Sequence, residues 1–94
     1  MNLFCDTVRK VQPGWLRAIT PGTIIFCLES EMVDHISLDH VLEKGEPSVQ
    51  ILTWIRNKKK AKANYPVPTI TIHTSNVAAR KKMEAMVKEI AALS

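Results

Sequence analysis

Short apolar, β-branched segments alternate with amphipathic helical segments along this chain. Strand patterns occupy residues 3–6, 15–19, 32–39 and 69–74. Helical patterns follow Thr20-Pro21, Pro47 and Ser75-Asn76. Strands that alternate with helices pair in parallel through right-handed crossovers. The order therefore predicts an α/β fold, namely a small three-layer sandwich whose mainly parallel sheet has about four strands. In plan this is flavodoxin-like but truncated.

The helical segments carry recognisable start signals and apolar faces. Thr20 is a hydroxyl N-cap followed by a proline, and the helix after it is expected to reach about Ser30. The second helix begins at Pro47, with Ser48 or Glu46 near its cap, and frays into the lysine run at 58–60. The third runs to about residue 92. Its predicted inward stripe consists of Ala79, Met83, Met86, Val87 and Ile90.

Length and composition exclude several classes of protein. The 94 residues suit one domain, 1–94, and the 46% hydrophobic fraction excludes a mainly disordered chain. The sequence has no apolar stretch long enough to cross a membrane and no signal peptide, which predicts a cytoplasmic protein. Cys5 and Cys27 lie in apolar runs, where free buried thiols are expected; Cys5 is interpreted as packing rather than as a nucleophile.

Polar side chains follow three of the predicted strands. Asp6-Thr7 ends the first, Asp39-His40 the central one, and His73-Thr74-Ser75-Asn76 the last. In open α/β sheets, ligands bind beyond the carboxyl ends of the strands. The pattern therefore predicts a site where these residues converge at one rim of the sheet.

Each of these residues also has a purely structural interpretation. Ser75 or Asn76 is a helix cap, Asp39 can accept backbone N–H bonds in its loop, and a strand-end histidine can be structural. His35 lies in the opening half of its strand and is interpreted as a surface residue. Trp15 and Trp54 are expected in the core or in a pocket wall.

Basic residues are concentrated in one part of the sequence. Between Trp54 and Met83 there are eight of them and no acidic residue: Arg56, Lys58, Lys59, Lys60, Lys62, Arg80, Lys81 and Lys82. Such a patch can attract phosphate-rich partners, including nucleic acid. The alternative is a solvated surface with cations at a helix C-terminus. No aromatic residue lies within either basic cluster, which disfavours base stacking.

Several segments together resemble the cyclic-phosphate-processing receiver-like domain, a small relative of the response-regulator receiver. They are Leu3–Arg9, Pro13-Gly14-Trp15, Ile36–His40, Trp54-Ile55, Ile72–Asn76 and Met83, in matching order over about 80 residues. The resemblance implies a truncated receiver-like fold. It also implies a site for a phosphate, including a cyclic phosphate at a nucleotide or RNA end.

The resemblance carries a candidate site onto matching positions. The implied residues are Asp6, Arg9, Asp39, His40, His73 and Asn76. His40 and His73, with Asp39, form the candidate acid–base group, because imidazole is suited to proton transfer. Arg9 binds phosphate oxygens, and Ser75 and Asn76 lie where a helix start binds an anion. Asp6 or Asp39 orients a histidine or helps to hold Mg²⁺.

Departures from the family pattern at four positions weaken the implied metal site and the implied hydrolase. Thr7 and Val41 replace acidic residues, Glu43 replaces a glycine, and Ser48 replaces the glycine before the following helix. Two interpretations remain open. One is an enzyme that hydrolyses a phosphate ester or cyclic phosphate. The other is a catalytically degenerate member, such as a viral accessory protein, that binds a phosphate-bearing molecule, a protein or nucleic acid.

Overall fold

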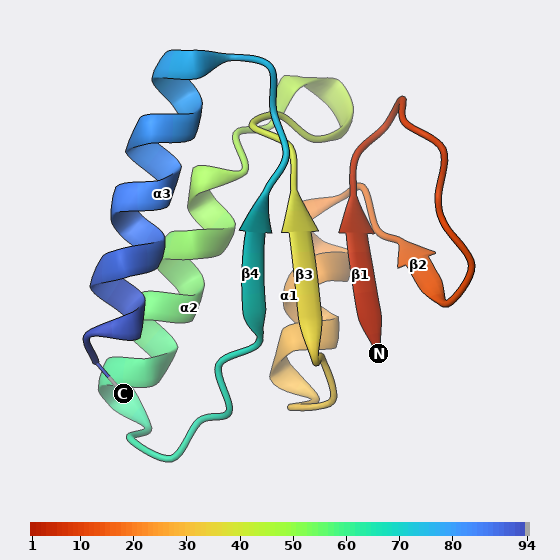
Figure 1. Cartoon of the computed structure of the whole chain (residues 1–94). Helices are drawn as coiled ribbons and strands as arrows, with labels where there is room; N and C mark the ends of the chain where they lie inside the picture. Colours follow the sequence, from red (N-terminus) through yellow and green to blue (C-terminus); the bar gives the residue numbers. More distant parts are fainter. Residues whose placement is uncertain (94) are drawn as a thin grey trace.

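Four short strands and three α-helices account for most of the chain. The computed structural model describes residues 1–93 (Figure 1). The strands are β1 (Asn2–Cys5), β2 (Trp15–Arg17), β3 (His35–Leu38) and β4 (Thr69–Ile72). The helices are α1 (Pro21–Glu29), α2 (Val49–Ala61) and α3 (Val77–Ala91), with a short 3₁₀ turn at Glu43–Gly45.

The strands form one sheet in the order β2-β1-β3-β4, with every neighbouring pair parallel. In this register Phe4 lies opposite Arg17 on one side and Ser37 on the other, and Ser37 lies opposite Thr71. Residues that are paired across parallel strands share a face. The predicted α/β class, with a parallel sheet of about four strands, is confirmed.

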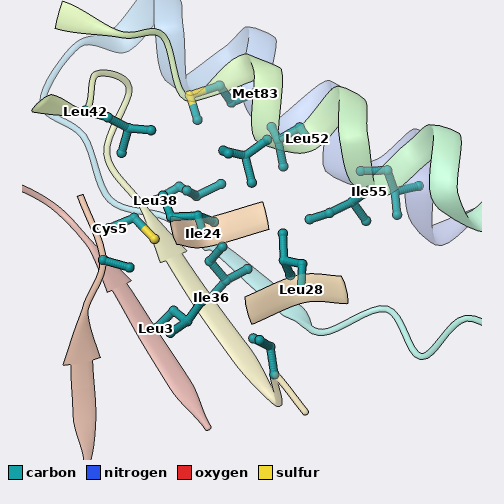
Figure 2. Packing of buried hydrophobic residues seen from close by; sticks show 14 residues of the cluster. Leu3, Cys5, Ile24, Leu28, Ile36, Leu38, Leu42, Leu52, Ile55 and Met83 are labelled. Atoms are coloured by element: carbon teal, nitrogen blue, oxygen red, sulfur yellow. The ribbon is translucent and has the colours of Figure 1, made fainter. Parts of the chain in front are cut away.

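Alternation along the strands points one set of side chains at the helices. Leu3 and Cys5 on β1 and Ile36 and Leu38 on β3 are fully buried and point toward the helices (Figure 2). They belong to a single core cluster with residues of all three helices: Ile24, Leu28, Ile51, Leu52, Ile55, Met83 and Ile90. Burial of each such side chain contributes about 1.5–3 kcal/mol.

The prediction of three layers is wrong, because α1, α2 and α3 all pack on the same face of the sheet (Figure 1). The α1 and α2 crossovers both run in the direction from β2 toward β4. The right-handed rule therefore places both helices on one side. Only the connection from β1 to β2 runs the other way, and residues 6–14 contain no helix. The second face is left open.

The helix starts follow local chemistry. The Thr20 hydroxyl accepts the N–H of Thr23 at 3.2 Å, with Pro21 in the first turn, as predicted. At α3 the cap is Asn76, whose Oδ1 accepts the N–H of Ala79 at 2.9 Å. Ser48 precedes α2, but its hydroxyl is buried and has no hydrogen-bond partner among residues 1–93.

Strands β2 and β4 each end two residues earlier than predicted, at Arg17 and Ile72. Two further boundaries differ for a local reason. Helix α2 does not fray at the lysines but continues through Lys58–Lys60 to Ala61, because lysine is a good helix former and cations are favoured near a helix C-terminus. Strand β3 begins only at His35, since Glu31 turns the chain with a φ of 63°. Among residues 1–93, no helix is both long and apolar enough to cross a membrane.

Candidate functional site

Asp6 is the first residue after β1, and its side chain is only 1% exposed. One carboxylate oxygen, Oδ1, accepts the backbone N–H groups of Val8 at 2.7 Å and Arg9 at 3.0 Å. The other, Oδ2, lies 3.0 Å from His73 Nε2 and 3.7 Å from Arg9 Nε. Asp6 therefore fixes the loop that follows β1 and connects it to the residue that follows β4.

Burial alone raises the pKa of the Asp6 carboxyl group, because it penalises the charged form. The hydrogen bonds from the Arg9 and Val8 N–H groups and from His73 act in the opposite direction. Their combined effect is larger, and the pKa of Asp6 lies below its ordinary value. Asp6 is therefore a carboxylate at neutral pH.

His73, which follows β4, has both ring nitrogens engaged. Nε2 faces Asp6 Oδ2, and Nδ1 lies 2.5 Å from the hydroxyl oxygen of Ser37 on β3. The ring also stacks on Phe4 of β1, with centroids 4.8 Å apart and an interplanar angle of 4°. Three neighbouring strands thus fix the position of one imidazole on the open face of the sheet.

The partners of His73 determine its neutral tautomer. A carboxylate only accepts hydrogen bonds, so Nε2 carries the proton that is donated to Asp6. Nδ1 then presents a lone pair, and the Ser37 hydroxyl donates to it. The three side chains form a chain of hydrogen bonds from hydroxyl to imidazole to carboxylate.

Two arginines flank this chain of hydrogen bonds. Arg17, the last residue of β2, donates to the backbone carbonyls of Asp6 and Arg9 and lies over the Phe4 ring at 6.0 Å. It thereby holds the 6–9 loop against the sheet. The Arg9 side chain is 54% exposed beside Asp6, so its guanidinium group is accessible to a ligand.

A cavity of about 350 Å³ opens on this face of the sheet. Its floor is formed by strand residues, and the 6–14 loop supplies one wall. The lining residues are Phe4, Arg9, Lys10, Gln12, Trp15, His35, Ser37, Thr71 and His73. His35, interpreted from the sequence as a surface residue, lies in this lining, hydrogen-bonded to Thr71 and edge-on to Trp15. Trp15 is a pocket-wall residue, as predicted.

His40 and Asp39, which follow β3, belong to a second group of side chains. His40 Nδ1 lies 2.7 Å from the Thr74 hydroxyl and 3.2 Å from Asp39 Oδ1, which also accepts the His40 N–H. No side-chain hydrogen bond among residues 1–93 joins this group to the one around His73. The His40 side chain is 33% exposed, and Nε2 has no hydrogen-bond partner within the same residues.

The remaining predicted site residues have mainly local partners. The Asn76 side chain caps α3, and Ser75 is exposed at the helix start. In the predicted basic patch, Arg80 donates to the Thr74 carbonyl, Lys59 to the Ala63 and Tyr65 carbonyls, and two further cations form the ion pairs Arg56–Glu89 and Lys62–Glu31. Half of the eight basic side chains are thus engaged within the chain.

A family model described as the Cyclic-phosphate processing Receiver domain matches residues 1–89 of the 94. The chain belongs to this family. Separate comparisons with curated proteins and with solved structures returned no significant match. The membership covers both groups of side chains described above and agrees with the receiver-like sheet.

The resemblance implied that Asp6 or Asp39 helps to hold Mg²⁺, but the side chains around Asp6 do not fit a divalent cation. Both Asp6 oxygens already accept hydrogen bonds, and Arg9 adds a positive charge on the same side. Residues 1–93 contain no group of three or more His, Cys, Asp or Glu side chains arranged to hold a metal ion. Thr7 is exposed, and Val41 pairs with Pro47, so neither position supplies a further carboxylate.

The structure adds site residues that sequence reasoning did not single out. Arg17 and Ser37 lie inside strands, where alternation alone marked them only as facing away from the core. Thr74 is 1% exposed and supports both His40 and the Asn76 N–H. The strand register is the signal that could have found these residues, because it brings Phe4, Ser37 and Thr71 side by side on the open face.

Proposed function

We propose that this receiver-like domain binds a phosphate ester, specifically a cyclic phosphate on a nucleotide or RNA end, and opens the ring by hydrolysis. The observation that carries the proposal is the cavity beside His73 on the open face of the sheet. Family membership in a cyclic-phosphate-processing group supports the same ligand class.

Cationic side chains provide the phosphate-binding part of the proposal. Arg9 and Lys10 line the cavity. The buried Asp6 carboxylate does not depend on either cation alone, because two backbone N–H groups already donate to it. A guanidinium group matches the paired oxygens of a phosphate. Aromatic rings of Trp15 and Phe4 in the same lining suit the nucleoside part of the ligand.

His40 does not line the cavity, and we assign to it proton transfer only with a ligand that extends past the carboxyl ends of β3 and β4. His40 Nδ1 is fixed by Asp39 and Thr74, which leaves Nε2 as the nitrogen that can give or take a proton. Asp39 and Thr74 are positioning residues for this ring. Both ring nitrogens of His73 are engaged, so the first group on which it can act is its partner Ser37.

A second candidate is a binding module at the same site without turnover, with a protein or nucleic acid as a further partner. The observation that favours it is the absence of acidic side chains at Thr7 and Val41, where the family pattern has them. The two candidates share the ligand and differ in whether product forms.

Calorimetric titration with a 2′,3′-cyclic nucleotide tests binding, and ³¹P NMR of the same sample tests ring opening. We expect Arg9→Ala to weaken binding about tenfold, because an exposed charged hydrogen bond is lost. The matched control Lys60→Ala removes the same charge from α2 and should bind as wild type. We expect His73→Gln, which removes the base in the cavity lining, to keep binding and lower turnover about 10²–10⁴-fold.

Three outcomes separate the candidates. Binding with product that depends on His73 supports the hydrolase. Binding without product supports the module without turnover. No binding at millimolar nucleotide overturns both candidates. Equal weakening of nucleotide binding by Arg9→Ala and Lys60→Ala overturns them as well, because it would indicate attraction by net charge alone.

A further inference from the structure

Ser37 occupies the outer end of the hydrogen-bond chain that runs through His73 to Asp6. Its Oγ lies 2.5 Å from His73 Nδ1, and His73 Nε2 lies 3.0 Å from Asp6 Oδ2. Asp6 is in turn fixed by two backbone N–H groups. An activated nucleophile requires this sequence of groups: a hydroxyl, a base within hydrogen-bond reach, and a third group that orients the base.

The direction of each proton in the chain suits nucleophilic attack. Because Asp6 accepts from Nε2–H, the lone pair on His73 is at Nδ1 and faces the Ser37 hydroxyl. Stacking on Phe4 holds the ring in this orientation. Removal of the Ser37 proton would form an imidazolium ion that the buried Asp6 carboxylate stabilises.

Ser37 also lies where a ligand can reach it. It is part of the cavity lining together with Arg9 and Lys10, whose cations can stabilise negative charge that develops on a phosphorus centre. The hydroxyl is presented from β3, in the middle of the sheet, and this rigid strand limits its movement.

We propose that Ser37 is a nucleophile that forms a covalent phosphoseryl intermediate with the phosphate ligand. Ser37 Oγ bonds to phosphorus while its proton passes to His73 Nδ1. The P–O2′ bond of the cyclic phosphate breaks, and O2′ takes the proton from His73. Water then attacks phosphorus and gives its proton to His73, and the P–Oγ bond breaks as Oγ is reprotonated. The net reaction adds one water to the cyclic ester.

The proposal rests on the proposed function for its ligand, and it is tested with a probe that does not depend on that ligand. An alkyl fluorophosphonate reacts with an activated serine: the Oγ–P bond forms, the P–F bond breaks, and fluoride leaves with the serine proton. Intact-mass measurement followed by peptide mapping locates the label. Circular dichroism of each variant establishes that it is folded.

We expect one label on Ser37 in the wild-type protein and none at that position in Ser37→Ala. His73→Gln should slow labelling by at least about 10²-fold, because the base is lost. Ser30→Ala is the matched control, since Ser30 is an exposed serine outside the cavity lining, and it should label as wild type. In the cyclic-nucleotide assay, Ser37→Ala should retain binding and lose turnover.

Absence of label on Ser37, or labelling that His73→Gln does not slow, overturns the proposal. Wild-type turnover of the cyclic nucleotide by Ser37→Ala does so as well. A labelled Ser37 in a protein that binds no cyclic nucleotide supports the nucleophile and rejects the proposed ligand. Turnover of the cyclic nucleotide by a protein whose Ser37 is not labelled supports the proposed ligand and rejects the nucleophile.

Discussion

The two strand-end histidines differ in which ring nitrogens their neighbours occupy. His73 is held at both nitrogens, by Ser37 and Asp6, whereas His40 is held only at Nδ1. Two histidines that look equivalent in the sequence therefore have different chemistry available to them. His40 Nε2 is free to exchange a proton, whereas His73 Nδ1 becomes available to a ligand only once Ser37 has given up its proton.

Cys5 illustrates how burial removes reactivity from a residue adjacent to the site. It is fully buried, and burial raises the pKa of its thiol to about 12. Because the thiolate is the reactive form, we expect iodoacetamide to modify Cys27, which is only partly buried, before Cys5 in the native protein. Peptide mapping after timed alkylation measures both rates. Modification of Cys5 as fast as Cys27 would contradict the inert thiol, and a urea-unfolded sample, in which both react, is the control.

At the scale of elements, the crossover directions determine which face of the sheet is open. The connections through α1 and α2 advance the same way across the sheet, and both helices lie on one side. The 6–14 connection runs back the other way without a helix. It instead contributes Arg9, Lys10 and Gln12 to a cavity wall.

Asn76 tests whether the start of α3 serves as a cap or as part of the ligand site. Its Oδ1 accepts the Ala79 N–H, so Asn76→Ala should destabilise the protein by about 1 kcal/mol, measured by urea unfolding. Thr20→Ala, at the corresponding cap of α1, should have a similar effect. Asn76→Asp keeps a capping oxygen and should retain both stability and cyclic-nucleotide affinity. A large loss of affinity in Asn76→Asp would mean that this side chain meets the phosphate.

The strands, the helices and most caps were predictable because each depends on local sequence. Thr20-Pro21 set the start of α1, and alternation marked Leu3, Cys5 and Ile36 as core. The number of layers was not predictable from alternation, because it depends on strand order. The contacts of His73 were also out of reach: Asp6 lies 67 positions away in the sequence, and only the register brings the two together.

At the scale of the whole molecule, the two faces of the sheet divide stability from chemistry. The helix-covered face holds the single core cluster, and the open face holds the cavity and the His73 array. We therefore expect substitutions in the cavity lining to leave the core intact. The domain thus offers a site where function can be altered with little change in folding.

Asp6 couples the open face to the stability of the whole fold at acid pH. Its pKa is lowered in the folded state below the unfolded value of about 3.9. The ionised carboxylate therefore stabilises the fold above about pH 4, and this contribution is lost as the pH falls through the lower folded value. We expect the urea unfolding midpoint of the wild type to drop between pH 5 and 3. Asp6→Asn should be less stable than the wild type at pH 5, and its urea midpoint should drop less over the same range.

The matched control for this acid prediction is Glu84→Gln, which neutralises an exposed carboxylate on α3. Its pH dependence should follow the wild type. If Asp6→Asn kept the full acid-induced drop, a different group would be responsible, and the assignment to Asp6 would be wrong.

The central claim is that a phosphate-bearing ligand occupies the cavity on the open face. The most direct measurement is NMR shift mapping during titration with a 2′,3′-cyclic nucleotide. We predict that the Trp15 indole N–H, the Arg9 side chain and the His73 ring shift together with one saturating affinity, because all three line that cavity. Shifts confined to the lysines of α2 and α3, with the cavity residues unmoved, would contradict the account.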